Sequence, residues 1–344
     1  NALPAWQGGL GMQRLIRAAG RRLAVRSDRQ AVGGLEVVRT LAEAGADNLR
    51  APFARKLLER LADAEPGYLA HEFMNENWAP CFHADVAAAF AEAKFTFVGS
   101  ARLHENFPDL MLNEGARKVA ARFDDPVLFE LIKDTIAGSA LRQDVYVRGL
   151  RRLTEAERNA ALGEVALVLT QRASGFRYEF EMPAGKASLN RNFYGPVVEA
   201  LASGPRLVRE LLELPGRDHE RVNAPELAAM LVGSGQAMVT LRPTATPERR
   251  LDQFHAAAAR RLSRASRLDH PVALASSRLG AGLVVPVLEL LVLSRLVTEG
   301  PAEPLCWARM LAPALDAEKQ EALAQSIARI LEERAQIWRL VGLI

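Results

Sequence analysis

Apolar side chains recur at three- and four-residue steps along most of the chain, which is the spacing of one face of an α-helix. The pattern predicts helices at 12–24, 35–44 and 126–135, one that begins at Pro52 and ends before Pro66-Gly67, and a last long helix capped by Asp316. We also expect Thr246 to cap a helix that Pro247 opens. In the 126–135 segment the apolar stripe consists of Val127, Leu128, Leu131 and Ile132. Ala, Leu and Arg dominate while aromatic residues make up only 6%, which favours helices over sheets.

Strand patterns are fewer and shorter. Phe176, Tyr178, Phe180 and Met182 alternate with charged residues, as in a half-buried strand. Two further strands are expected, at 95–97 before Gly99-Ser100 and at 237–241. The predicted fold class is therefore α+β, mostly helical, with a small α/β domain, a winged-helix-like domain and C-terminal helices.

The winged-helix prediction rests on three short helices at 194–202, 206–214 and 225–232 with flanking strands. Asn223 and Glu226 form a start that is similar to a capping box. A helix that reads DNA needs Arg, Lys, Asn or Gln at the base edges, but 225–232 (PELAAMLV) carries one acid and no base. A protein partner is therefore favoured and no nucleic acid is expected, while a winged-helix transcriptional regulator stays as an alternative.

Charge and cysteine content exclude other classes. The net charge of +3 comes from 44 basic and 41 acidic residues, too small an excess for a basic nucleic-acid surface. Cys81 and Cys306 match no redox or zinc spacing, so a reducing, cytoplasmic location is expected. No signal peptide is visible, and the apolar run 283–297 contains Pro286, Glu289 and Arg295. That run is predicted to be a buried helix, and no membrane contact is expected.

Neither a nucleotide cofactor nor a metal is supported by the motifs. Close glycines at 8–11, 233–235 and 280–282 lack the strand and ribose-binding acid of a dinucleotide site, so turns are favoured. His71-Glu72 resembles half of a zinc-protease motif, whose second His would stand where this chain has Asn75. His71, His83 and Asp85 could still converge on a metal, which leaves a small metal-dependent hydrolase as a second alternative.

The segment 140–151 (ALRQDVYVRGLR) has no clean period and concentrates polar residues, which indicates a functional or interdomain loop. Arg142 and Arg148 could clamp a carboxylate or phosphate, because the guanidinium binds such groups bidentately. Alternatively, Asp144 pairs with one of these arginines and fixes the loop. The two interpretations carry equal weight.

Several motifs, taken in order, resemble a known family. They are Tyr68-Leu69-x-His71-Glu72, Trp78-x-Pro80, Phe82-His83-x-Asp85-Val86, Phe95-x-Phe97-Val98-Gly99 and the run Arg142 to Gly149. This pattern resembles the regulatory domain that follows the catalytic domain in bacterial methyltransferases that use S-adenosylmethionine (AdoMet), with rickettsial protein-lysine methyltransferases as relatives. Asn1-Ala2-Leu3-Pro4-x-Trp6 resembles the segment just after that catalytic domain, with Ala5 in place of a family glycine.

The resemblance implies that this chain lacks the catalytic domain, with a helical segment at 1–66, a regulatory domain at 67–160, the winged-helix-like domain at 161–245 and helices at 246–344. No catalytic or cofactor residue is then carried by the chain, and AdoMet belongs to the absent domain. The expected partners are that domain and a protein substrate, with homodimerisation left open. The candidate substrate- or partner-binding residues are His71, Glu72, Trp78, His83, Arg142, Asp144 and Arg148.

Overall fold

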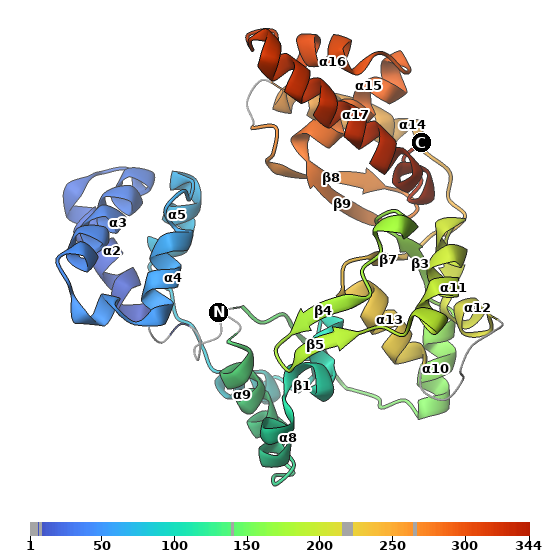
Figure 1. Cartoon of the computed structure of the whole chain (residues 1–344). Coiled ribbons are helices and arrows are strands. Elements are labelled where there is room, and N and C mark those ends of the chain that lie inside the picture. Colours follow the sequence, from blue (N-terminus) through green and yellow to red (C-terminus); the bar gives the residue numbers. More distant parts are fainter. Residues whose placement is uncertain (1–5, 7–8, 139–140, 215–222, 264–266) are drawn as a thin grey trace. The chain divides into compact units, whose positions relative to one another are not determined.

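The computed structural model describes residue 6 and residues 9–138, 141–214, 223–263 and 267–344 (Figure 1). Most of the opening segment 1–6, with Gly8 and Ala140, lies outside the described residues. The described chain is mostly helical with small two- and three-stranded sheets, which confirms the predicted α+β class. It divides into two compact units, Asn1–Arg151 with Glu181–Gly185, and Arg152–Phe180 with Lys186–Ile344.

The first unit begins with a helical bundle. Its elements are α2 (Leu10–Leu23), α3 (Ser27–Glu43), the 3-10 turn η2 (Asp47–Leu49), α4 (Pro52–Arg60) and α5 (Pro66–Phe73). Leu69 and Phe73 of α5 are buried in the same core as Ile16, Leu35 and Leu57. The helical segment that was predicted to end at residue 66 therefore continues through α5, and Pro66 begins a helix instead of ending one.

Two glycines bring α2 and α3 close together. A Cβ on Gly20 would lie 2.1 Å from the carbonyl oxygen of Gln30, and one on Gly34 would lie 2.0 Å from that of Ile16. Both atoms belong to the backbone of the opposite helix, so no rotamer change relieves the overlap. The spacing of these two helices therefore requires glycine at both positions.

The rest of the first unit combines short helices with one two-stranded sheet. Its elements are α6 (His83–Glu92), β1 (Phe95–Ser100), η3 (Leu103–Asn106), α7 (Pro108–Met111), α8 (Glu114–Ala120), α9 (Pro126–Ala137) and β2 (Asp144–Arg148). β1 and β2 are antiparallel, with Thr96 opposite Val147 and Ser100 opposite Asp144. The prediction of a loop at 140–151 was wrong over 144–148, because the partner strand of β2 lies some fifty residues earlier and leaves no local signal.

The second unit starts with a helical part around a three-stranded sheet of order β6-β3-β7. Its elements are α10 (Glu155–Gly163), β3 (Ala166–Leu169), η4 (Ala173–Gly175), α11 (Arg191–Ala202), β6 (Arg206–Leu207), α12 (Val208–Leu212), α13 (Ala224–Gly233) and β7 (Ala237–Thr240). The hairpin of β4 (Glu179–Met182) and β5 (Gly185–Ser188) is divided between the units, with Glu181–Gly185 in the first. The strand predicted from Phe176 begins only at Glu179. Asn223 caps α13 by accepting from the Glu226 N–H, as expected.

The central strand β3 precedes the three helices α11, α12 and α13 in the chain and pairs antiparallel with both neighbours. Helix α13, which occupies the place of a reading helix in the winged-helix interpretation, buries Ala224 and the run Leu227–Leu231. It is therefore mainly a core element of this part.

The second unit ends with α14 (Arg249–Leu262), β8 (Pro271–Ser276), β9 (Ala281–Pro286), α15 (Val287–Glu299), α16 (Pro304–Leu311) and α17 (Ala317–Leu340). Asp316 caps α17, as predicted. The single buried helix predicted for 283–297 was wrong in its first part, because Leu283 and Val285 alternate inward along β9 and Pro286 stands at the N-cap of α15. Thr246 does not cap α14, whose N-cap is Glu248.

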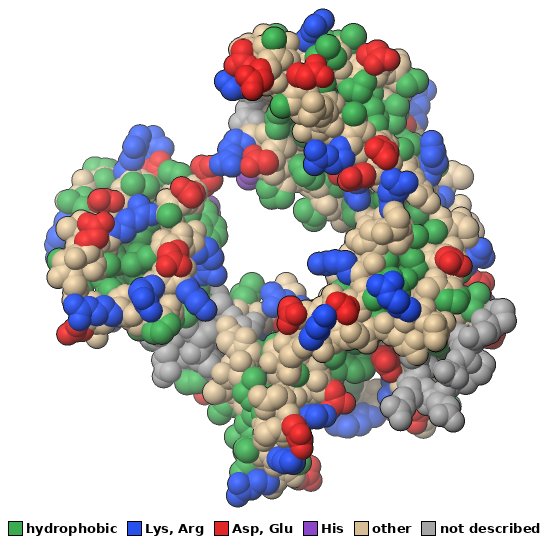
Figure 2. All heavy atoms as spheres, in the orientation of Figure 1, with side chains coloured by type: hydrophobic (Ala, Val, Ile, Leu, Met, Phe, Trp, Pro, Cys, Tyr) green, Lys and Arg blue, Asp and Glu red, His purple; other side chains and the backbone are tan. Residues whose placement is uncertain are grey.

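The surface mixes charges of both signs. On the face that Figure 2 shows, basic and acidic side chains are interspersed instead of forming a field of one sign. In the described part of the chain, no helix has the length and apolar character needed to span a lipid bilayer.

Candidate functional site

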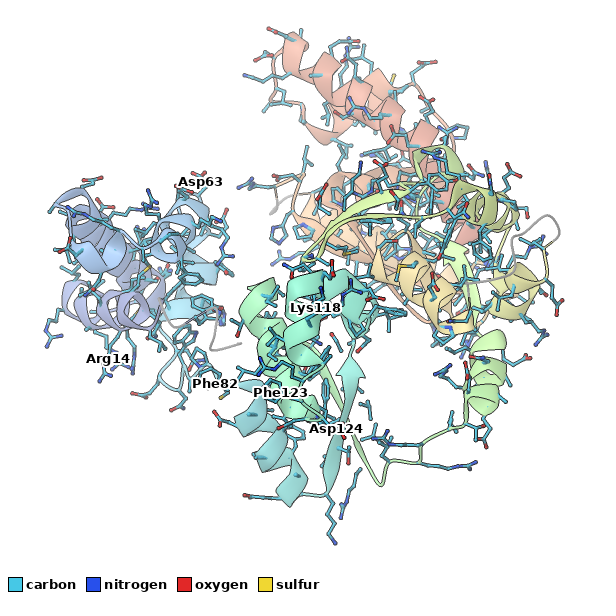
Figure 3. The ribbon with its side chains drawn as sticks, turned by 60° about the horizontal axis from the view of Figure 1, so that its bottom comes forward. Arg14, Asp63, Phe82, Lys118, Phe123 and Asp124 are labelled. Carbon is cyan, nitrogen blue, oxygen red and sulfur yellow. The ribbon has the colours of Figure 1, made fainter. Side chains whose placement is uncertain are left out.

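A pocket of about 480 Å³ opens in the first unit, beside the sheet of β1 and β2. It is lined by Cys81, His83, Val86, Phe90, Arg142, Asp144 and Tyr146. His83 is the first residue of α6, which follows Phe82 as its N-cap (Figure 3), and Asp144 is the first residue of β2. Residues from two segments about sixty positions apart therefore meet in one concave site.

Asp144 holds together the polar edge of the pocket. Its Oδ2 lies 3.0 Å from His83 Nδ1 and 3.0 Å from Arg142 Nε, while Oδ1 lies 2.9 Å from Arg142 Nη2. Burial on its own would raise the pKa of Asp144, but the hydrogen bonds from His83 and Arg142 outweigh it, so the pKa lies below its ordinary value. Asp144 is thus an ionised acceptor for a proton on His83 Nδ1.

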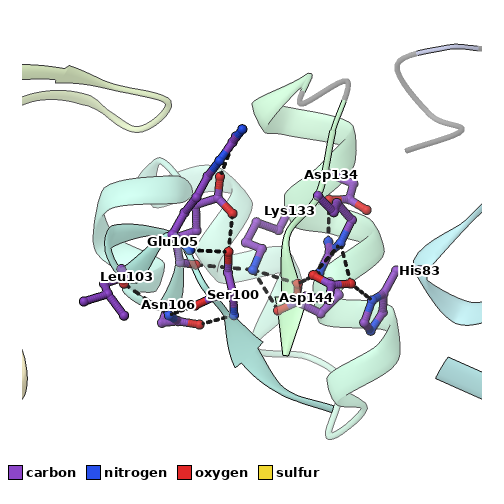
Figure 4. A network of polar contacts seen from close by, with 11 residues as sticks. His83, Ser100, Leu103, Glu105, Asn106, Lys133, Asp134 and Asp144 are labelled. Atoms are coloured by element: carbon purple, nitrogen blue, oxygen red, sulfur yellow. Dashed lines mark hydrogen bonds and ion pairs between the residues drawn. The ribbon is translucent and has the colours of Figure 1, made fainter. Parts of the chain in front are cut away.

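Arg142 is surrounded by carboxylates, of which Asp134 and Asp144 are labelled in Figure 4. Besides Asp144, its Nη1 lies 2.5 Å from Asp134 Oδ1 and its Nη2 lies 2.6 Å from Glu130 Oε2. Burial opposes the charged form, yet the hydrogen bonds with Asp144 and Glu130 together with the charge of Asp134 raise the pKa of Arg142. Of the two interpretations of this segment, the structure has the ion pair, and a substrate anion would have to compete with three protein carboxylates for the guanidinium.

Helix α9 turns its charged face inward. Glu130, Lys133 and Asp134 are its buried residues, whereas Val127 and Ile136 are 37% exposed. The stripe that was predicted as the buried face is therefore only partly covered, because α9 packs against the cation of Arg142. Lys133 Nζ lies 2.8 Å from Glu130 Oε1 and 3.3 Å from the carbonyl oxygen of Glu105, which joins the network to the turn after β1.

Asp134 is the least satisfied member of this network. Its Oδ2 is buried without a hydrogen-bond partner, and burial raises the pKa of the carboxyl despite the nearby Arg142. The ionised form is therefore costly in the folded protein.

Asp134→Asn is accordingly expected to change the pH dependence of stability. The pKa of Asp134 is higher in the folded protein than its ordinary value of 3.8. The protonated carboxyl therefore contributes fully to the free energy of unfolding below pH 3.8, and this contribution is lost as the pH rises through the folded pKa. Asn does not ionise, so the stability of the variant relative to the wild type should be higher at about pH 7 than at about pH 3.5. Thermal unfolding at both pH values measures this, with the exposed Asp124→Asn ahead of the same helix as control (Figure 3). A pH-independent difference would contradict the assignment.

An aromatic wall completes the pocket. Phe90 and Tyr146 are stacked with ring centroids 4.4 Å apart, and His83 meets Phe97 edge-on at 4.6 Å. The Tyr146 hydroxyl is buried without a hydrogen-bond partner, and burial raises its pKa to about 12, so it remains a proton donor at neutral pH. The site thus offers an imidazole ring, a phenol donor and a flat apolar surface.

The seven sequence-predicted residues do not form one site. The structure brings His83, Arg142 and Asp144 together. His71 and Glu72 lie on α5, and Trp78 is partly buried and packs edge-on against Trp6 at 5.0 Å beside the core of the helical bundle. Arg148 is exposed at the last position of β2.

Sequence reasoning missed the residues that surround this trio. Glu130, Lys133 and Asp134 lie outside the predicted apolar stripe and were not considered, although their i, i+3, i+4 spacing places all three on one side of the helix. Phe90 and Tyr146 carried no separate signal, because aromatic residues in a short helix and strand are usually core. Cys81, which matches no redox or zinc spacing, also lines the pocket, with its Sγ 3.3 Å from the carbonyl oxygen of Ala79.

The metal-dependent alternative lacks a ligand set in the described residues. No group of three His, Cys, Asp or Glu side chains there is placed to hold a metal ion. His83, which that alternative shares with His71 and Asp85, is buried against Asp144 instead.

Comparison with known proteins connects this geometry to a family. Residues 65–148 match the family described as "Predicted methyltransferase regulatory domain". The uncharacterized protein sll1526 of Synechocystis sp. (strain ATCC 27184 / PCC 6803 / Kazusa) is 28% identical over 297 residues, which cover 85% of this chain and 58% of that protein. The chain thus spans little more than half the length of this curated relative.

Solved structures share the fold. PKMT2 from Rickettsia typhi in complex with AdoHcy superposes with a TM-score of 0.58 at 13% identity, over 99% of this chain and 74% of that one. A second structure of PKMT2 from Rickettsia typhi superposes with a TM-score of 0.58 at 14% identity, over 99% of this chain and 73% of that one. The chain is therefore methyltransferase-related: it contains a region that matches a methyltransferase regulatory domain, within a fold that PKMT2 shares.

Proposed function

We propose that this methyltransferase-related chain is the regulatory and substrate-binding part of a class I AdoMet-dependent methyltransferase that acts on protein substrates. The observation that carries the proposal is the position of the pocket: His83, Arg142, Asp144 and Tyr146, which line it, all fall inside the region 65–148 that matches the regulatory family. The fold shared with AdoHcy-bound PKMT2 supports it, since AdoHcy is what remains of AdoMet after methyl transfer.

The physical basis is a rigid polar frame behind an accessible aromatic surface. Arg142, Asp144, Glu130 and Asp134 are held by hydrogen bonds to one another, so the pocket edge is formed before any ligand arrives. Phe90, which is 41% exposed, is the part of the wall that a partner reaches first. A preformed pocket of this kind lowers the ordering cost of binding a side chain or loop of a protein substrate.

The remaining elements of the proposal follow the sequence resemblance. AdoMet is bound by a separate catalytic domain, and this chain contributes neither catalytic nor cofactor residues. His71, Glu72, Trp78 and Arg148 lie outside the pocket and are proposed to contact the catalytic domain or the protein substrate elsewhere. A cytoplasmic location, without nucleic-acid or membrane partners and with homodimerisation open, belongs to the same proposal.

Pocket substitutions are expected to separate substrate binding from cofactor binding. In the methyltransferase that carries this chain, Phe90→Ala should raise KM for the protein substrate by about tenfold, which corresponds to about 1.4 kcal/mol, and leave KM for AdoMet unchanged. Tyr146→Phe should act in the same direction, because it removes only a hydroxyl that has no partner within the protein. Steady-state transfer of a labelled methyl group measures both constants.

Tyr68→Phe is the matched control, since Tyr68 is 51% exposed in the same unit and does not line the pocket. If Phe90→Ala changed the KM for AdoMet but did not change the KM for the protein substrate, the pocket would be a cofactor site. Calorimetry of the isolated chain provides a second test: saturable AdoMet binding in the micromolar range would contradict the placement of the cofactor in another domain.

A further inference from the structure

A groove of about 620 Å³ in the second unit runs beside two strands. Its lining includes the consecutive residues 282–286 of β9, together with Ala237 and Met238 of β7. Side chains on one face of a strand alternate, so a lining of consecutive residues means that the groove follows the edge of β9 and exposes its backbone.

The strand register shows which backbone groups face the groove. The Ala275 N–H of β8 donates to His255 Nε2 at 3.0 Å and therefore points away from β9. Ala275 is paired with Gly282, so this is a non-hydrogen-bonded pair, and Gly282 also directs its N–H and C=O away from β8. Because hydrogen-bonded and non-hydrogen-bonded pairs alternate, the N–H and C=O of Val284 also point away from β8. In the described residues β9 pairs only with β8, and β7 ends its sheet beside β3 (Figure 1).

Apart from Pro286 at its last position, this edge lacks the features that usually prevent strand addition. Natural edge strands carry a Lys, an inward charge or a bulge that blocks pairing with another chain. β9 reads Ala-Gly-Leu-Val-Val-Pro, has no charged residue, and leaves Val284 70% exposed. The two ends are defined, by the turn at Gly280 on one side and by Pro286 on the other.

The charge of the groove selects among occupants. Its charged residues are Glu289 and Arg334, whose Oε1 and Nε lie 2.9 Å apart, so the lining is neutral overall. A neutral lining gives no electrostatic attraction to an acidic or a basic peptide. The N–H and C=O groups at the edge of β9 can instead pair with the backbone of an uncharged segment.

We propose that this groove binds an extended, uncharged segment of a partner protein, which adds to β9 as a further strand. Main-chain hydrogen bonds to Gly282 and Val284 supply the affinity, and the apolar side chains of Met238 and Val284 contact alternate side chains of the segment. The proposal concerns a different unit from the His83–Asp144 pocket and holds or fails independently of the methyltransferase role.

The test uses the 344-residue chain and a fluorescently labelled, blocked pentapeptide of alternating Val and Thr, followed by anisotropy without AdoMet. Val284→Pro removes the N–H that faces the groove, and Val284→Ala shortens the same side chain but keeps that N–H. We expect Val284→Pro to weaken binding at least about tenfold and Val284→Ala by less than about threefold. Circular dichroism verifies that both variants fold, which is expected because neither breaks the ladder with β8.

Ala273→Pro is the matched control. Ala273 is the register partner of Val284, so its N–H lies on the opposite edge of the same sheet, and its loss should leave peptide binding unchanged. The proposal is overturned if Val284→Pro binds the peptide as tightly as Val284→Ala does, or if Ala273→Pro loses as much affinity for the peptide as Val284→Pro. It is also overturned if the wild type shows no saturable binding up to millimolar peptide. Dimerisation of the chain in sedimentation that Val284→Pro abolishes would also overturn it, because a second copy would then occupy the edge.

Discussion

Arg142→Ala is expected to lower the free energy of unfolding of the first unit by about 3–5 kcal/mol, the usual cost of removing one partner from a buried ion pair. The substitution leaves Glu130, Asp134 and Asp144 close together, with side chains between 4% and 12% exposed and without their shared cation. Lys133 is the remaining nearby cation, and its Nζ is already bound to Glu130. Hydrogen exchange of the α9 and β2 amides measures the change within this unit.

Two variants make this result specific. Arg50→Ala removes an exposed arginine that pairs with Asp47 three residues away, and such surface pairs contribute about 0–1 kcal/mol. Arg142→Lys keeps the charge but loses the planar fork that reaches three carboxylates, so an intermediate loss is expected. If Arg142→Ala were no more destabilising than Arg50→Ala, the network would not hold α9 against β2.

Gly34→Ala is expected to destabilise the helical bundle by about 1–3 kcal/mol or more, because overpacking forces the backbone to move. The added Cβ would lie 2.0 Å from the Ile16 carbonyl oxygen, so α2 and α3 must separate and lose contacts around Ile16, Leu35 and Val38. Exchange of the α2 and α3 amides, together with the fluorescence of Trp6 and Trp78 in this core, reports the effect.

Gly11→Ala is the matched control on α2. A Cβ there meets nothing within 4 Å, so the variant should gain about 0.5–1 kcal/mol from helix propensity. The opposite signs of the two glycine substitutions distinguish close packing from propensity. Equal effects at Gly11 and Gly34 would show that the two helices are not held at this distance.

The sequence predicted what depends on local pattern. Signals within a few residues were enough to predict the α+β fold class and four local features. These are the strand that begins at Phe95, the start of α4 at Pro52, and the helix caps at Asn223 and Asp316. In the site, it selected His83, Arg142 and Asp144 as polar groups in unusual segments, and the structure brings these three together.

What the sequence could not show depends on partners far along the chain. An apolar stripe is expected to face the core, but α9 turns Glu130, Lys133 and Asp134 inward. The Arg142 cation on another segment attracts the two carboxylates, and Lys133 pairs with Glu130. The strand β9 was taken for helix because the continuous apolar run 283–286 hides its alternation, and such a run is consistent with a buried helix or a buried strand. From the sequence alone, Gly34 is only a residue of low helix propensity within a helix. Its role becomes visible when the structure places the backbone of α2 beside it.

The last helix has a consequence for the order in which the chain folds during synthesis. Arg334 of α17 donates to the carbonyl oxygen of Thr170, and Gln336 donates to that of Ala202, across 164 and 134 residues. The charge network of the first unit, by contrast, is complete once Asp144 has left the ribosome. Because domains generally fold in the order in which they emerge, we expect the first unit to form early. The second unit can be completed only after α17 has been made, because these two hydrogen bonds join α17 to segments far earlier in the chain.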